Sequence, residues 1–145
     1  EYPCGRYLNG QDIPNLLTVG ASGATNDQQL VAPFSNYGRQ SVDVFAPGVG
    51  VWSTLAGGQY GPKSGTSMAT PVVAGIAAVL KTYFPQLGPA ELKRIIMQSA
   101  VPYHTQVPKP GTKELVDFAT LSRSGGIVNL YEAVRLASTS PTAAK

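Results

Sequence analysis

The chain has 145 residues, of which 43% are hydrophobic, and it carries a formal net charge of +3. This length suffices for one compact core and argues against a second full domain. The 11 Lys and Arg residues are scattered, with Lys93-Arg94 the only adjacent pair, so we expect no nucleic-acid partner. No apolar run approaches the roughly 20 residues of a membrane span, and one Cys and one His exclude a His/Cys zinc site.

The first half of the chain predicts strands. "LLTVGAS" (16–22) and "SVDVFAPG" (41–48) have the short apolar and β-branched runs of buried strands, and the connection between them is polar. Ala56-Gly57-Gly58 suits the turn of a hairpin made by "VWSTL" and "QYGPKSG". The opening segment 1–15 is rich in Pro, Gly and Asn, which predicts a loop; its Cys4 is expected to be a small buried hydrophobe or half of a bridge to another segment.

The second half predicts helices. The apolar run 72–80 indicates a helix buried on every side, and "GPAELKRIIMQSA" (88–100) predicts an amphipathic helix with Pro89 at its first position. Residues 101–124 contain charged residues and prolines and are expected to form a surface excursion. A last short helix lies within "IVNLYEAVRLAS", with Asn129 as its cap, and 138–145 reads as a disordered tail or linker. The fold class is α/β.

Ser67 lies in "GTSMATP", at the start of the apolar helix. A helix N-terminus has unpaired N–H groups and about half a positive charge, so an oxyanion that forms beside such a serine is stabilised. Gly65 permits a sharp turn, and Pro71 is tolerated if the helix begins near Met68. The alternative is structural: Thr66 or Ser67 is an ordinary N-cap of a core helix.

The string "GTSMATP" followed by "VVAG" resembles the serine-nucleophile motif of the subtilisin-like serine proteases, the subtilases. "LLTVGAS", "FSNYGRQSVDVFAPGVGVWST" and "GGIVNLYEAV" are similar to further pieces of the family's catalytic domain, in the family's order. The resemblance implies that residues 1–137 are the C-terminal part of that domain: parallel strands, a hairpin, a buried serine-bearing helix and two further helices. It also implies that Ser67 is the nucleophile and its backbone N–H an oxyanion donor, that Thr66 supports the oxyanion hole and that Met68 is an oxidisable neighbour. The family often has His where this chain has Val72, a position outside the triad.

The family's triad runs in the order Asp, His, Ser, so the general base and its carboxylate belong before Ser67. The single histidine, His104, comes after Ser67, and we interpret it as a solvated loop residue. Asp12, Asp27 and Asp43 precede Ser67, but none sits in a segment like the family's aspartate motif. We therefore expect this chain to be an incomplete fragment, inactive alone. Its expected partners are the upstream half of the same domain, with the Asp, the His and the oxyanion Asn, or a second copy.

The resemblance carries further expectations. The substrate is a polypeptide, no cofactor is required, and the protein is secreted or at the cell surface. A structural calcium ion is compatible with the family, and Asp43 is the one candidate cation contact. Glu1 falls near the base of the pocket for the side chain before the scissile bond, where an acid favours Lys or Arg.

Three function classes follow. The first is a serine endopeptidase that forms an acyl-enzyme on Ser67. The second is a pseudoprotease or non-catalytic binding module that keeps the fold without the triad. The third is an unrelated serine hydrolase, for which a "GxSxG" turn is expected and "GTSMA" does not supply it.

Overall fold

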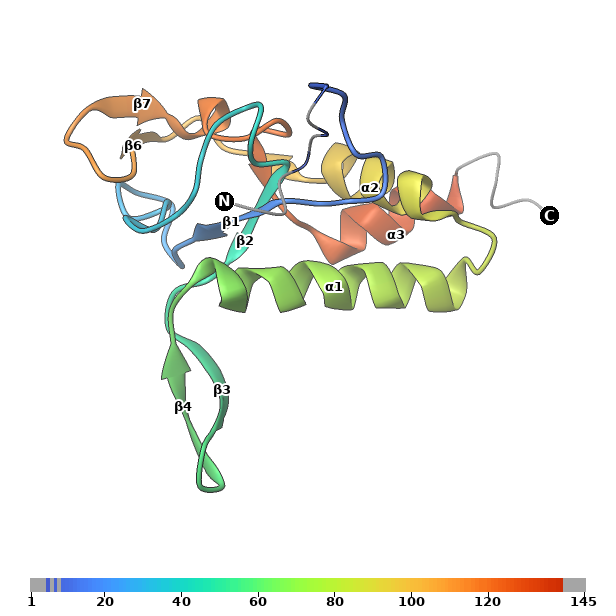
Figure 1. Ribbon diagram of the computed structural model, residues 1–145, viewed down its shortest axis with the longest axis horizontal. Helices are drawn as coiled ribbons and strands as arrows, with labels where there is room; N and C mark the ends of the chain where they lie inside the picture. The colour runs from blue at the N-terminus through green and yellow to red at the C-terminus, as the bar shows by residue number, and fades with distance from the viewer. Residues whose placement is uncertain (1–4, 6, 8, 140–145) are drawn as a thin grey trace.

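A four-stranded sheet forms the centre of the computed structural model, which describes residues 5, 7 and 9–139. Strands β1 (Val19–Ser22), β2 (Val44–Pro47) and β8 (Gly126–Ile127) run parallel, and β5 (Val101–Pro102) pairs antiparallel with β8. The order is β1-β2-β8-β5, so β1 is an edge strand of this sheet (Figure 1). Both predicted buried strands are confirmed, each shorter than its apolar run.

The predicted hairpin is also confirmed. Strands β3 (Val51–Leu55) and β4 (Gln59–Lys63) pair antiparallel, from Val51 opposite Lys63 to Leu55 opposite Gln59. Gly57 and Gly58 have φ angles of 75° and 71°, a region that glycine adopts without steric cost, so the turn between the strands needs both. The hairpin projects away from the rest of the molecule, beyond the start of α1 (Figure 1).

Three helices lie on one face of the sheet: α1 (Thr66–Tyr83), α2 (Pro89–Gln98) and α3 (Leu130–Ser138). Pro89 is the first residue of α2, as predicted, and the Gly88 N–H donates to Glu91 Oε2 at 3.2 Å. Asn129 caps α3 by accepting a hydrogen bond from the Glu132 N–H at 3.0 Å, again as predicted. The α3 helix includes Ser138; residues 140–145 lie outside the described part of the chain.

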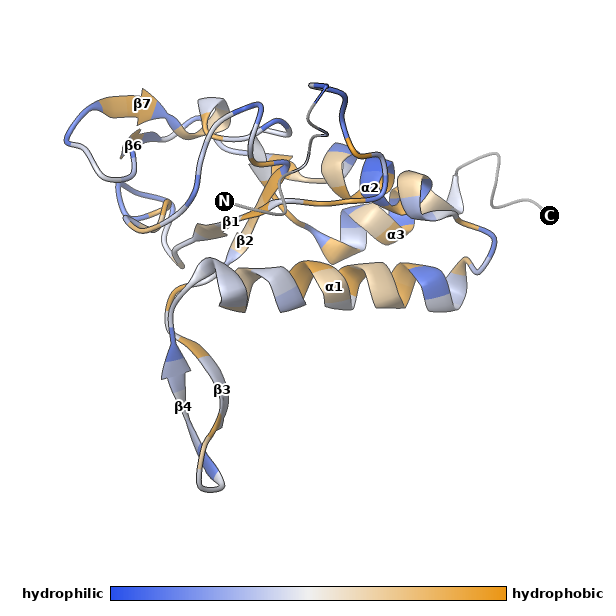
Figure 2. Ribbon diagram, in the orientation of Figure 1, coloured by the Kyte–Doolittle hydropathy of each residue, from blue (hydrophilic) through white to orange (hydrophobic). Residues whose placement is uncertain are grey.

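Burial of α1 is restricted to one side. Its buried residues are Ala69, Val73, Ile76 and Leu80, which face the sheet, α2 and α3. Ala74, Gly75 and Ala78 are exposed, although the middle of this helix is hydrophobic (Figure 2). The sequence indicated burial on every side; within the described residues nothing packs on this second face.

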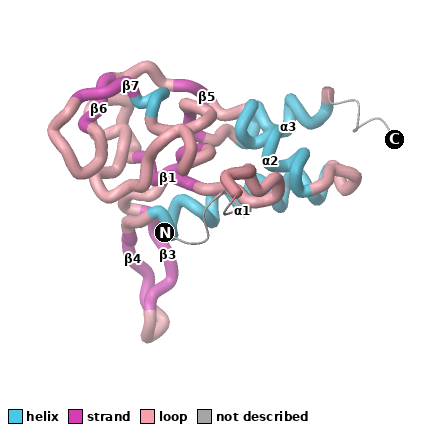
Figure 3. Tube along the Cα trace, turned by 45° about the horizontal axis from the view of Figure 1, so that its top comes forward, coloured by secondary structure: helices cyan, strands magenta, loops and turns pink. Residues whose placement is uncertain are grey.

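Residues 101–124 are more structured than the sequence suggested. They contain a small hairpin, β6 (Gln106–Pro108) with β7 (Leu115–Asp117), and a 3₁₀ turn, η1 (Phe118–Thr120). The segment expected to be a surface excursion instead contributes to a second hydrophobic core, on the sheet face opposite α1. Val107 and Phe118 pack on Phe45 of β2 there, and the ring centroids of Phe45 and Phe118 are 4.8 Å apart. Figure 3 shows this side built from strands and loops and the helices gathered on the other.

Candidate active site

Ser67 is the second residue of α1, and its side chain is exposed. The N-cap is Gly65, and no side chain makes a capping hydrogen bond, so the alternative in which Thr66 or Ser67 caps the helix is wrong. The helix begins at Thr66, earlier than the predicted Met68, and Pro71 therefore falls in its second turn. The missing N–H of Pro71 removes the helical donor to the Ser67 carbonyl.

The backbone N–H of Ser67 points out of the helix without an acceptor among the described residues. The next two N–H groups, of Met68 and Ala69, both donate to the Gly65 carbonyl, at 3.0 and 3.3 Å. No acidic side chain lies in the first turn of α1, so the positive end of the helix dipole is not neutralised locally. An anion that forms beside Ser67 meets both the dipole and a free donor.

The turn that carries Ser67 is fixed by contacts to the segment after β2. Gly65 donates its N–H to the Gly48 carbonyl at 2.8 Å, and the Gly50 N–H donates to Ser64 Oγ at 2.9 Å. A Cβ on Gly48 would lie 2.7 Å from the Ala21 Cβ and 2.9 Å from the Gly65 oxygen, so only glycine permits this close approach.

Gly48 and Ser64 hold the Ser67 turn in place, and the sequence reasoning missed both. Gly48 entered the sequence analysis only as the last residue of the run 41–48 expected to form a strand, and Ser64 carried no signal of its own. Their positions in the sequence could have indicated them: Gly48 ends a predicted strand, and Ser64 directly precedes the glycine of the serine motif.

Thr66 and Met68 flank Ser67 on the same turn. The Thr66 carbonyl accepts a hydrogen bond from Thr70 Oγ1 at 2.9 Å, which ties the first turn to the second. Met68 is half-buried, with its sulfur 3.8 Å from the position of a Cβ on Gly65. Val72 is half-buried one turn along and packs against the core of the helical face.

His104 lies away from Ser67, on the segment before β6 that belongs to the opposite face of the sheet. Its side chain is 74% exposed, as expected for a solvated loop residue, and Nδ1 is 3.0 Å from Asp117 Oδ2. The hydrogen bond from His104 lowers the pKa of Asp117, and the Ala119 N–H lowers it further.

The three aspartates that precede Ser67 have other partners. Asp12 binds the Arg123 guanidinium through both carboxylate oxygens, at 2.8 and 2.9 Å. Asp27 accepts from the Gln29 N–H, which is the main reason that its pKa is lowered. Asp43 precedes β2, whereas the Ser67 turn packs at the far end of that strand. None of the three is hydrogen bonded to Ser67, and Glu1 lies outside the described residues.

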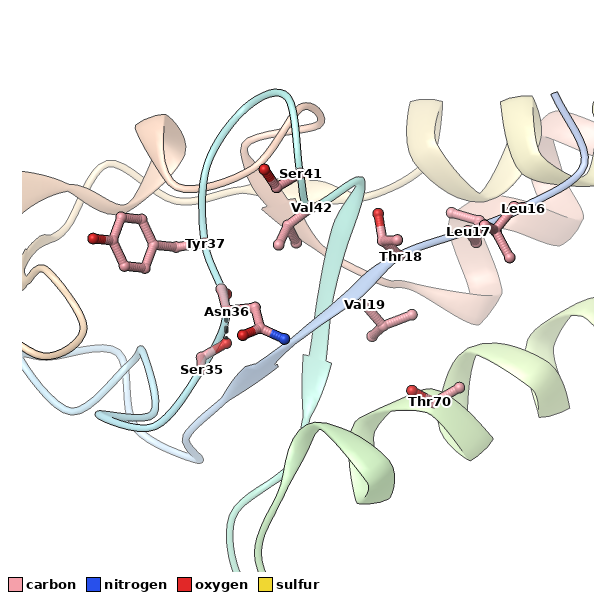
Figure 4. Close-up of a pocket in the computed structure, with 10 residues that line it drawn as sticks. All are labelled: Leu16, Leu17, Thr18, Val19, Ser35, Asn36, Tyr37, Ser41, Val42 and Thr70. Carbon is pink, nitrogen blue, oxygen red and sulfur yellow. Dashed lines mark hydrogen bonds between the residues drawn. The ribbon is translucent and has the colours of Figure 1, made fainter. Parts of the chain in front are cut away.

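A cavity of about 520 Å³ lies beside the start of β1, lined by segment 16–19, by residues of the loop 35–42 and by Thr70 of α1. Figure 4 shows Leu17, Thr18 and Val19 on the segment that runs into β1, with the lining residues of loop 35–42 on one side of them and Thr70 of α1 on the other. The C-terminal end of β1 is covered along this edge of the sheet, since the Ala21 N–H donates to Ser35 Oγ and the Ala32 N–H donates to the Ala21 carbonyl. Along 17–19, no described strand pairs with this edge.

Comparison with known families matches residues 4–127 to the subtilase family. Among curated proteins, a cuticle-degrading protease from Metarhizium anisopliae is 49% identical over 87 residues, which is 60% of this chain and 21% of that protein. Subtilisin E from Bacillus subtilis is 45% identical over 80 residues, which is 55% of this chain and 20% of that protein. The chain thus spans about a fifth of the length of these relatives.

Solved structures give the same result. A protease from Pseudoalteromonas arctica superposes with a TM-score of 0.65 and 32% identity, covering 86% of this chain and 36% of that one. The serine protease MycP1, described as a component of a type VII secretion system, gives a TM-score of 0.61 and 27% identity, covering 82% of this chain and 31% of that one. Along the described residues, no helix has the length and apolarity needed to cross a membrane.

Proposed function

Because this chain belongs to the subtilase family, we propose that it supplies the nucleophile-bearing part of a serine endopeptidase, with Ser67 as the nucleophile. One observation carries this proposal: an exposed serine in the first turn of α1 beside a free N–H, on a turn that is held by Gly48. The family's activity extends to the chain through this site, because the matched residues include the whole turn and helix.

The proposed reaction is acyl transfer. Ser67 Oγ attacks the carbonyl carbon of a peptide bond while a general base takes its proton, and a C–O bond forms to give a tetrahedral oxyanion. The C–N bond then breaks, and the base returns the proton to the leaving amine. Water then attacks the carbonyl carbon of the resulting ester while the base takes a proton from the water. The bond to Ser67 Oγ breaks, the base returns the proton to this oxygen, and the acid product is released.

The oxyanion is where this chain contributes most. The Ser67 N–H and the uncompensated N-terminus of α1 supply a preorganised donor and a positive potential. Thr66 supports this geometry, because its carbonyl is held by Thr70 and its own position is fixed by the Gly65 turn. Removing one such donor typically lowers the rate by ~10²–10³.

The general base must come from outside the described residues in this proposal, because the single histidine, His104, belongs to the opposite face of the sheet. Absence of the base alone lowers the rate by typically ~10²–10⁴, so we propose that the chain is inactive without the upstream half of the domain. That half carries the Asp, the His and the second oxyanion donor. The cavity beside β1 and the exposed side of α1 are its proposed docking surface, and a second copy is the competing occupant.

The experiment is labelling with a fluorophosphonate probe followed by peptide mapping, on this chain alone and with the upstream half added in trans. We expect labelling of Ser67 only when the upstream half is present, and none in the Ser67→Ala variant. Absence of labelling under both conditions, with the two halves shown to associate, contradicts the proposal and favours a pseudoprotease or binding module.

Two finer proposals concern the whole protein. It is secreted or at the cell surface, which the likeness to a protease named for degrading cuticle supports. Glu1 favours Lys or Arg before the scissile bond, and a substrate panel on the assembled enzyme that shows no preference for basic side chains contradicts this. Neither proposal requires a cofactor.

A further inference from the structure

The carboxylate of Asp43 is buried, with 4% of its side chain exposed, at the point where the chain enters β2. Its Oδ2 accepts hydrogen bonds from the Thr18 N–H at 3.0 Å and the Thr18 hydroxyl at 3.2 Å. Its Oδ1 faces the Arg123 guanidinium, with Nε at 3.7 Å. A charge at this depth requires compensation from a nearby positive group.

Lys93 of α2 provides that positive group. Its ammonium lies 3.0 Å from Asp43 Oδ2 and 10% of its side chain is exposed. The same nitrogen donates to the Leu16 carbonyl at 2.6 Å and to the Ile13 carbonyl at 3.4 Å. Three oxygens from two separate segments of the chain therefore converge on one nitrogen atom.

This oxygen set is of the kind that a hard divalent cation takes. Calcium binds carboxylate and backbone carbonyl oxygens, six to eight of them, at about 2.3–2.6 Å. The residues present do not fit a bound calcium ion, however, because the Lys93 ammonium already occupies the point where the oxygens converge. A divalent ion added there meets a like charge at contact distance, and Arg123 adds a second positive group.

We propose that the Lys93 ammonium is a built-in cation that takes the place of a calcium ion at Asp43, so that this part of the protein is held without metal. The ammonium joins segment 13–16, which leads into β1, to Asp43 and to α2, as a bound ion would. The expected structural calcium contact at Asp43 is replaced in this proposal by a covalently attached charge that chelators do not remove.

The test compares two variants of the 145-residue chain that both lack the ammonium. Lys93→Ala leaves room for an ion and its waters beside the three oxygens, whereas Lys93→Met fills the same space with an apolar chain. Melting temperatures are measured in EDTA and in 10 mM CaCl₂, with Asp43→Asn/Lys93→Ala as the control that lacks the carboxylate. Arg94→Met, on the exposed side of the same helix, controls for loss of a surface charge.

We expect the Tm of the unmodified chain to be the same in EDTA and calcium. Lys93→Ala is expected to melt about 10 °C lower in EDTA, because it leaves a buried carboxylate without its partner. Calcium then raises its Tm by about 3–6 °C, as binding with a millimolar dissociation constant predicts. Lys93→Met and the double variant gain nothing from calcium.

Two results overturn the proposal. One is a calcium-dependent Tm of the unmodified chain that Asp43→Asn abolishes, and the other is a folded Lys93→Ala variant that calcium does not stabilise. If Lys93→Ala does not fold, amide NMR spectra of the unmodified chain decide: calcium-induced shifts at Thr18 and Asp43 refute the proposal, and unchanged signals support it. This outcome is independent of whether Ser67 reacts with a fluorophosphonate.

Discussion

The close approach at Gly48 gives the sharpest prediction. In Gly48→Ala, the added Cβ would lie 2.7 Å from the Ala21 Cβ, 2.9 Å from the Gly65 oxygen and 3.2 Å from the Ala69 Cβ. Ordinary carbon–carbon contacts are about 3.5–4.0 Å, so β1 or the first turn of α1 must move by several tenths of an ångström or more. The Gly65 oxygen belongs to the backbone and the Ala21 Cβ to a strand of the sheet, so neither can move far.

Overpacking of this kind costs about 1–3 kcal/mol, and the pair of contacts below 3.0 Å places Gly48→Ala in the upper part of that range. For a chain of this size that corresponds to a fall in Tm of roughly 5–10 °C. Because Gly48 accepts the hydrogen bond that fixes the Gly65 turn, we also expect fluorophosphonate labelling of Ser67, with the upstream half present, to slow by ~10-fold or more.

Gly75→Ala is the matched control for stability. Gly75 lies on the exposed side of α1, where a Cβ meets nothing within 4 Å. Replacing a helical glycine with alanine there is expected to stabilise by up to about 1 kcal/mol. Urea unfolding of both variants checks the reasoning: a Gly48→Ala variant as stable as the unmodified chain, or the same sign for both substitutions, refutes it.

Other predictions follow from single contacts. Asn129→Ala removes the cap that accepts from the Glu132 N–H and is expected to cost about 1 kcal/mol in urea unfolding, whereas Asn129→Ser retains most of that stability. The His104 hydrogen bond holds the pKa of Asp117 below its ordinary value of 3.8, so this carboxylate stabilises the fold above that value and the contribution is lost as the pH falls through the lowered pKa. Acid unfolding of Asp117→Asn is therefore expected to depend less on pH below about 4; an unchanged profile contradicts this. Peroxide treatment is expected to slow probe labelling by oxidising Met68, and Met68→Leu is expected to resist; equal loss in both would show that another residue is responsible.

Local patterns carried most of the fold. The strands at β1 and β2, the hairpin with its glycine turn, Pro89 at the start of α2 and the Asn129 cap depend on short-range rules, and the sequence expresses those rules directly. Short-range rules also placed Ser67 at the start of a helix, whereas its assignment as the nucleophile came from the resemblance to the subtilases and stays a prediction. The start of this helix was misplaced by two residues, because Pro71 was expected in the first turn and the helix tolerates it in the second.

Long-range packing could not be predicted from such patterns. The burial of Phe118 and Val107 depends on Phe45, which is far away in the sequence, so the segment 101–124 looked like a surface loop. The apolar composition of α1 predicted burial on all sides, but burial also depends on which other segments are present. The partnership of Asp43 with Lys93 joins residues 50 positions apart, and neither residue alone signals it.

The hairpin β3–β4 has one more consequence, for engineering. The two ends of the hairpin lie side by side, since Gly65 is hydrogen bonded to Gly48 and Ser64 to Gly50. Residues 51–63 therefore form a loop whose ends are held together by these hydrogen bonds. A change in the length of this loop leaves the geometry of the Ser67 turn unchanged. Doubling a flexible loop costs only about 0.6 kcal/mol in closure entropy. The tip at Gly57 is thus the place where an inserted tag or reporter domain would leave the Ser67 turn in position.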